Sequence, residues 1–203
     1  MTTFIEQAIE RAGLSPVLAQ RRSGDLEAVR ASVASWGAAD LLVVGAIADA
    51  LRAEDVGDVV RIHERAPHAT ATEDAAVTWV DAAAHASELE FLRAVAVARI
   101  TADPGARIGV DWSTSGLELA QVALGFGACE LRGPITRKSG LPIASGEQLK
   151  VKGRGLVELR SIKKQEIGAL VTHAGRRPIF DDDEPAPHEG PPARESNREV
   201  ARA

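Results

Sequence analysis

The chain has 203 residues, of which 45% are apolar and only 3% aromatic, and its formal net charge is −5. This length predicts one domain with room for a tail, and the negative charge argues against a general nucleic-acid binder, which is usually basic. The start of the chain lacks the basic and apolar blocks of a secretory signal, and no apolar run reaches the roughly 18 residues that span a bilayer. We therefore expect a cytoplasmic protein with no membrane partner.

The single cysteine, Cys129, limits the chemistry of the chain. One thiol cannot form an internal disulfide, a zinc site built from cysteines or a three-cysteine iron–sulfur site. Because Cys129 lies in an apolar segment, we interpret it as a small buried side chain in preference to a reactive thiol.

Helices are predicted in three parts of the chain. Apolar residues recur there at helical spacing, Asp40 and Ser87 stand at capping positions, and Gly13, Gly37 and Gly175 mark ends. The predicted helical ranges are residues 3–13, 14–22, 25–36, 41–51, 75–85, 89–100 and 161–173.

Residues 59–63, VVRIH, form the first predicted strand, and residues 64–74 are predicted to be a loop. His63 and His68 lie at or within this loop without the fixed spacing and partner acid of a metal site. We therefore interpret them as solvated loop histidines rather than metal ligands.

The segment 108–133, IGVDWSTSGLELAQVALGFGACELRG, predicts a strand, a helix that begins at a capping box of Ser115 and Glu118, and a second strand. Such a β-α-β unit normally pairs its strands in parallel. Ligands of parallel sheets meet the carboxyl ends of the strands. The residues predicted at these ends are Asp111, Trp112 and Ser113 after the first strand, and Arg132 and Gly133 after the second.

Residues 134–158 are punctuated by glycine and carry an excess of Lys and Arg, Arg137 and Lys138 among them. One interpretation is a solvated loop with a small hairpin, residues 148–151 pairing with 156–159. The other is an anion-binding flap, because Lys, Arg and flexible backbone N–H groups suit phosphate or carboxylate. The glycines match neither the P-loop nor the dinucleotide fingerprint.

Three further stretches carry a resemblance: GAADLLVVGAIADALRAEDVGDVVRIHERAP at the front, EFLRAVAVARI with the segment 108–133, and IKKQEIGALVTHAGRRPIF. Together they cover about half of the chain. They resemble the opening and closing portions of the radical-SAM enzymes of menaquinone and deazaflavin biosynthesis, the group of aminofutalosine synthase, dehypoxanthine futalosine cyclase and FO synthase. The resemblance implies a parallel barrel, in which the first and last strands are neighbours, so residues 59–63 should lie beside residues 128–131.

The chain departs from this family in two respects. The family's cluster motif, CxxxCxxC, should follow the first strand, but residues 70–80 contain no cysteine. Too few residues separate His63 from Glu88 for several βα units of roughly 30 residues each. The resemblance therefore does not extend to cleavage of S-adenosylmethionine, and no cofactor, metal ligand or catalytic residue is predicted.

We expect an α/β domain over residues 1–180, helix-rich, with a small, mostly parallel sheet resembling a partial barrel, and a disordered, Pro-rich acidic tail over residues 181–203. The first functional hypothesis is a non-catalytic, shortened relative of radical-SAM enzymes. It would be a binding or regulatory protein linked to menaquinone-type cofactor biosynthesis, as a homodimer or with a larger barrel protein, because open sheet edges seek partners. The alternative is an enzyme or binding protein for an anionic small molecule. Its contact residues would be Asp111, Trp112, Ser113, Arg132, Arg137 and Lys138.

Two further considerations bear on these hypotheses. Asp111 is the one evident acid–base candidate, although a lone Asp is more often a helix cap. An RNA contact through the basic segment is disfavoured by the overall charge and the lack of aromatic residues there.

Overall fold

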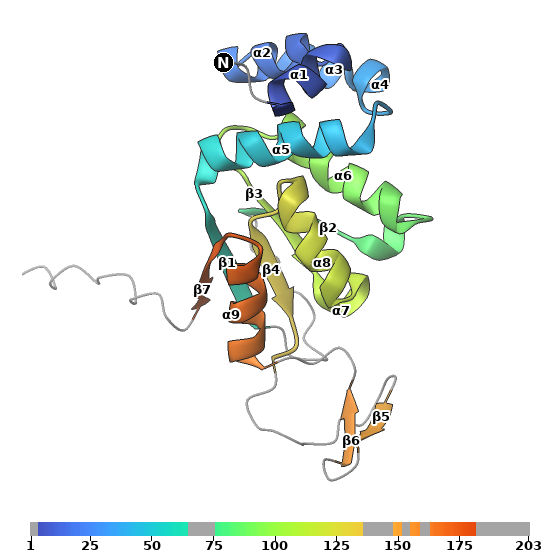
Figure 1. The fold of residues 1–203 in the computed structure, drawn as a ribbon, viewed down its shortest axis with the longest axis vertical. Coiled ribbons are helices and arrows are strands. Elements are labelled where there is room, and N and C mark those ends of the chain that lie inside the picture. The colour runs from blue at the N-terminus through green and yellow to red at the C-terminus, as the bar shows by residue number, and fades with distance from the viewer. Residues whose placement is uncertain (1–3, 65–75, 136–147, 152–154, 159–162, 182–203) are drawn as a thin grey trace, which may run out of the picture.

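The computed structural model describes residues 4–64, 76–135, 148–151, 155–158 and 163–181. Its central sheet consists of β1 (Val59–Glu64), β2 (Val77–Val80), β3 (Arg107–Asp111), β4 (Glu130–Gly133) and β7 (Arg177–Phe180). The strand order is β2-β3-β4-β1-β7, and every neighbouring pair is parallel (Figure 1). The predicted α/β class with a small parallel sheet is therefore confirmed.

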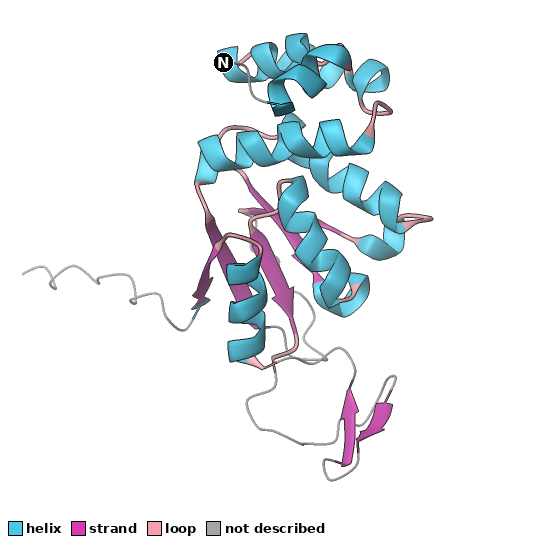
Figure 2. Ribbon diagram, viewed as in Figure 1, coloured by secondary structure: helices cyan, strands magenta, loops and turns pink. Residues whose placement is uncertain are grey.

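The helices that precede the sheet are stacked at one end of the molecule (Figure 2). They are α1 (Phe4–Arg11), α2 (Ser15–Ser23), α3 (Leu26–Ala31), α4 (Val33–Trp36) and α5 (Leu41–Val56). The Asp40 carboxylate caps α5 as predicted, because it accepts hydrogen bonds from the backbone N–H groups of Leu42 and Val43. The single helix predicted over residues 25–36 is divided at Ser32 into α3 and α4.

The later helices connect the strands. They are α6 (Glu88–Thr101), α7 (Trp112–Ser115), α8 (Leu117–Ala123) and α9 (Lys164–His173), with short 3-10 helices η1 (Ala82–Ala84) and η2 (Leu124–Phe126). The parallel neighbours β2 and β3 are joined by α6, and β3 and β4 by α7 and α8, so the predicted β-α-β unit is present. β1 pairs with β4, from Arg61 opposite Glu130 to Glu64 opposite Gly133, so residues 59–63 lie beside the strand that was predicted to be their neighbour, although the last strand is β7, on the other side of β1.

Two local predictions are wrong, and one strand was missed. Residues 75–85 do not form a helix but contain strand β2 and η1, because the β-branched and aromatic run VTWV outweighs the alanines around it. Ser115 does not cap the helix after β3: Gly116 precedes α8, and the Ser115 hydroxyl donates to the carbonyl of Asp111. The predicted stop after α9 is present, since the helix ends at His173 and Gly175 follows it, but the strand β7 beyond it, which pairs with β1, was not predicted.

The predicted hairpin is present as β5 (Gln148–Val151) and β6 (Gly155–Glu158), which pair antiparallel. The tail predicted to be disordered lies outside the described residues, apart from Asp181. Within the described ranges, none of the helices has the length and apolar character needed to cross a bilayer.

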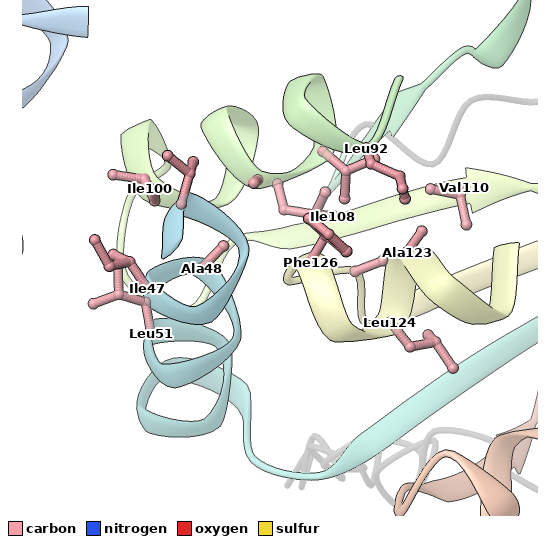
Figure 3. Close-up of a cluster of buried hydrophobic side chains, with 14 of the residues drawn as sticks. Ile47, Ala48, Leu51, Leu92, Ile100, Ile108, Val110, Ala123, Leu124 and Phe126 are labelled. Carbon is pink, nitrogen blue, oxygen red and sulfur yellow. The ribbon is translucent and has the colours of Figure 1, made fainter. Parts of the chain in front are cut away.

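The hydrophobic core lies on one face of the sheet. Val60, Ile62, Ile108, Val110 and Leu131 point to this face and are at most 1% exposed. Figure 3 shows Ile108 and Val110 among side chains of α5, α6 and the α8–η2 segment. Burial of each such side chain stabilises the fold by roughly 1.5–3 kcal/mol. Because successive side chains of a strand point to opposite faces, the residues between these core positions point to the other face of the sheet.

Candidate functional site

The opposite face of the sheet carries charged and aromatic side chains, and we call it the polar face. The strand register aligns Trp79, Gly109, Glu130, Arg61 and Ile179 across β2, β3, β4, β1 and β7. Two residues further along, toward the carboxyl ends, the register aligns three further residues: Asp111, Arg132 and His63. Since side chains alternate between faces along a strand, both rows lie on the same side of the sheet.

Glu130 is the centre of this face, with a side chain only 1% exposed. Both of its carboxylate oxygens accept from the Arg107 guanidinium, at 2.6 and 3.0 Å. Its Oε2 also lies 2.6 Å from Nε2 of His63, and its Oε1 lies 4.0 Å from Nη1 of Arg61. Burial alone raises the pKa of Glu130, but His63 and Arg107 outweigh it and hold that pKa below its ordinary value. Glu130 is therefore an ionised carboxylate held among cations.

His63 lies between two carboxylates. Its Nε2 faces Glu130, and its Nδ1 lies 2.9 and 3.0 Å from the two carboxylate oxygens of Asp181, the residue after β7. Burial alone lowers the pKa of His63, but the hydrogen bond to Glu130 and the charge of Asp181 outweigh it and raise that pKa. Only the imidazolium form can donate from both nitrogens, so this geometry favours the charged ring.

Asp111, Arg132 and Trp79 form the second half of the polar face. The Asp111 carboxylate accepts from Nε of Arg132 at 3.0 Å, and it caps α7 by accepting from the backbone N–H of Ser113 at 2.9 Å. The guanidinium carbon of Arg132 lies 4.1 Å from the centre of the Trp79 ring, a cation–π contact. The His63 ring meets the edge of the same Trp79 at 5.7 Å between centres. Trp79 thus joins the Arg132 and His63 parts of the face.

The structure brings three of the predicted ligand residues together. Asp111, Ser113 and Arg132 are joined by hydrogen bonds at the carboxyl ends of β3 and β4, as the β-α-β prediction requires. Trp112 is 1% exposed and lies against Gly133, where an added Cβ would meet its indole ring at 2.2 Å. Arg137 and Lys138 lie outside the described residues.

Glu130, Arg107 and Trp79 were not predicted as site residues. The interpretation of His63 as a solvated loop residue is wrong, because His63 is half-buried within β1. A signal was available. Parallel strands covered on both faces are apolar throughout, whereas here charged residues alternate with apolar ones, as in RIH and ELR. That alternation marks a sheet face that apolar helices do not cover.

Cys129 is buried and its Sγ accepts from Arg99 at 3.1 Å. Burial raises the pKa of the thiol above its ordinary value, which favours the protonated thiol over the nucleophilic thiolate. Within the described residues, no group of three His, Cys, Asp or Glu side chains is arranged to hold a metal ion.

No protein-family model matches this chain, and no curated protein matches it at a significant level. The interpretation of the polar face therefore depends on its geometry and charge.

Proposed function

We propose that the protein binds a small anionic molecule on the polar face of its sheet, and that it is a binding or regulatory protein rather than a radical-SAM enzyme. The observation that carries this proposal is the excess of cations on the face. The strand residues that point to it include five cationic side chains and two acids: Arg61, His63, Arg107, Arg132 and Arg177 against Asp111 and Glu130.

Stability alone is a poor explanation for such a cluster. Half-buried ion pairs lose hydration on folding, and apolar residues of similar volume would often stabilise a fold as well or better. Clustered charges at the carboxyl ends of parallel strands are instead a common arrangement in ligand sites. The Trp79 ring adds an apolar surface beside the cations, which suits a ligand that is part organic and part anionic.

Two cations of the face are partly exposed, so water and small anions can reach them. Arg61 has a side chain 39% exposed and lies 4.0 Å from Glu130, which retains its closer partners Arg107 and His63. Arg132 is 18% exposed; among the described residues its guanidinium donates from Nε to Asp111, and its face lies over the Trp79 ring. Guanidinium groups bind carboxylates and phosphates through paired hydrogen bonds.

The experiment is a titration with small anions, followed through the tryptophan fluorescence. Arg61→Gln should weaken binding about tenfold, because one charge-assisted hydrogen bond contributes roughly 1.5–3 kcal/mol. The matched control is Arg22→Gln, which removes an exposed arginine paired with Glu54 at the helical end of the molecule. Absence of anion binding to the wild-type protein, or equal losses in both variants, would refute the proposal.

A relationship to the menaquinone and deazaflavin enzymes remains part of this proposal. The pairing of β1 with β4 supports it, because the resemblance predicted those strands to be neighbours. The chain's one cysteine, which is buried, supports a role without the cluster chemistry of that family.

The open sheet favours a second candidate function, association with a copy of the chain or with a larger barrel protein. Within the described residues β2 and β7 each pair on one side only, so the sheet has two edges. Unpaired strand edges can bind a further strand or be covered by a partner.

A further inference from the structure

The two carboxylates that flank His63 differ in kind. Glu130 belongs to β4, is 1% exposed and is fixed by the bidentate contact with Arg107. Asp181 follows the last strand, and its side chain is 55% exposed. Water therefore reaches Asp181 freely, whereas Glu130 is part of the scaffold.

Asp181 shows what the Nδ1 side of His63 can bind. Its two oxygens lie at nearly equal distances from Nδ1, 2.9 and 3.0 Å, so the imidazole N–H points between them. This is a carboxylate bound at the cationic edge of the polar face, supplied by the chain itself. Ion pairs with an exposed partner are weak, so an external anion can replace Asp181.

We propose that the Nδ1 side of His63 is a carboxylate-binding position, and that Asp181 is its intramolecular occupant, which a carboxylate ligand displaces. This inference rests on the proposed function and names its ligand class, a small carboxylate. Arg61 lies two residues before His63 on the same face, and Arg177 is exposed on β7. A second carboxylate of the ligand therefore has cations beside the first.

The residue order makes the competition intramolecular. Asp181 is joined directly to β7, whose Phe180 pairs with Ile62, so its carboxylate is always close to His63. A short tether gives the Asp181 carboxylate an effective concentration on the order of millimolar at His63. A free ligand displaces it only at a higher concentration or with a higher affinity. Removing the Asp181 charge should therefore strengthen ligand binding.

The test uses the full chain and three probes: succinate, its neutral analogue succinamide, and inorganic phosphate. Binding is followed by the backbone amide NMR signals of the strands, in protein labelled with ¹⁵N, so that variants with and without the His63 ring can be compared. Asp181→Asn should bind succinate about two- to fivefold more tightly than the wild type, and His63→Gln should lose this gain. Asp183→Asn removes the same charge two residues further on and is the matched control, for which we expect wild-type affinity.

The outcomes separate the inference from the proposed function. Succinate binding at the polar face with equal affinity in the wild type and Asp181→Asn would refute the competition by Asp181. Equal gains in succinate affinity in Asp181→Asn and Asp183→Asn would show that the loss of any negative charge strengthens binding, and would also refute the competition by Asp181. Preference for phosphate, or binding of succinamide as tight as that of succinate, would refute the carboxylate class. Failure of every anion to bind the wild type or any variant would instead refute the proposed function itself.

Discussion

At the scale of single residues, the polar face depends on His63 and Glu130. Each has a pKa moved from its ordinary value, 6.5 for His63 and 4.5 for Glu130, and the shifts are in opposite directions. Each stabilises the charged form of the other, so the pair is most favourable when both groups are ionised.

The first prediction is a pH dependence of stability. The pKa of His63 is raised in the folded protein, so its contribution is fully present below pH 6.5 and is lost as the pH rises through the folded-state value. The pKa of Glu130 is lowered, so its contribution is present above pH 4.5 and is lost on acidification. His63→Gln should therefore destabilise the protein by about 1 kcal/mol more at pH 5.5 than at pH 8.5.

Urea unfolding of the wild type and His63→Gln at both pH values measures this difference. His173→Gln is the control, since His173 is an exposed residue at the end of α9. Equal destabilisation by His63→Gln at the two pH values would mean that folding does not shift the pKa of His63.

The second prediction concerns the buried carboxylate. Glu130→Ala leaves Arg107 and His63 without their shared counter-charge, and breaking a buried pair in this way costs roughly 3–5 kcal/mol. Arg107 and His63 are 24% and 20% exposed, so water can partly restore their hydration, and we expect about 3 kcal/mol. The control Glu54→Ala removes an exposed pair with Arg22 and should cost less than about 1 kcal/mol. Similar losses in the free energy of unfolding of the two variants, measured with urea, would show that Glu130 does not hold the cations of the polar face.

At the scale of elements, the sequence predicted what depends on local pattern. The caps at Asp40 and Ser87 are present, and the apolar strand pattern located β1, β3 and β4. Strand β2 was missed because its four residues lie among alanines, and their partner β3 is about 30 residues away. Pairing over such distances depends on tertiary contacts, which local pattern does not contain.

The candidate site was predicted in part for the same reason. Asp111 and Arg132 end neighbouring strands of one β-α-β unit, so their proximity follows from a local rule. The contacts of Glu130 with His63 and of His63 with Asp181 join residues 67 and 118 positions apart in the chain. Only the sheet order brings them together.

The third prediction tests how Trp112 packs against the end of β4. A Cβ at Gly133 would lie 2.2 Å from the Trp112 ring, so Gly133→Ala must displace that buried indole. Overpacking of this kind costs typically 1–3 kcal/mol. The control is Gly125→Ala, because nothing lies within 4 Å of a Cβ there. Thermal unfolding should show a clear loss for Gly133→Ala and almost none for Gly125→Ala, and the reverse order would contradict this packing.

At the scale of the whole molecule, the fold leaves the sheet open. A barrel closes its sheet and has no free edge, whereas in the part of the chain that the structure describes the sheet ends at β2 and β7, each four residues long. The helices α5, α6 and α8 provide the core on one face, and the polar face lies on the other.

The last prediction is association through this open sheet. We expect a homodimer or a complex with a larger barrel protein, with a contact that buries at least roughly 1,000 Å² in total, as specific interfaces do. Short edge strands give little area by themselves, so the contact should extend from an edge onto the polar face, whose mixed charges can pair with those of a second copy.

Light scattering after size-exclusion chromatography measures the mass of the species in solution directly. Because the polar-face contacts are ionic, the dimer should weaken as salt rises, and saturating succinate should compete with it. A chain that stays monomeric at high micromolar concentration and low salt would rule out the homodimer and leave the polar face to its small ligand.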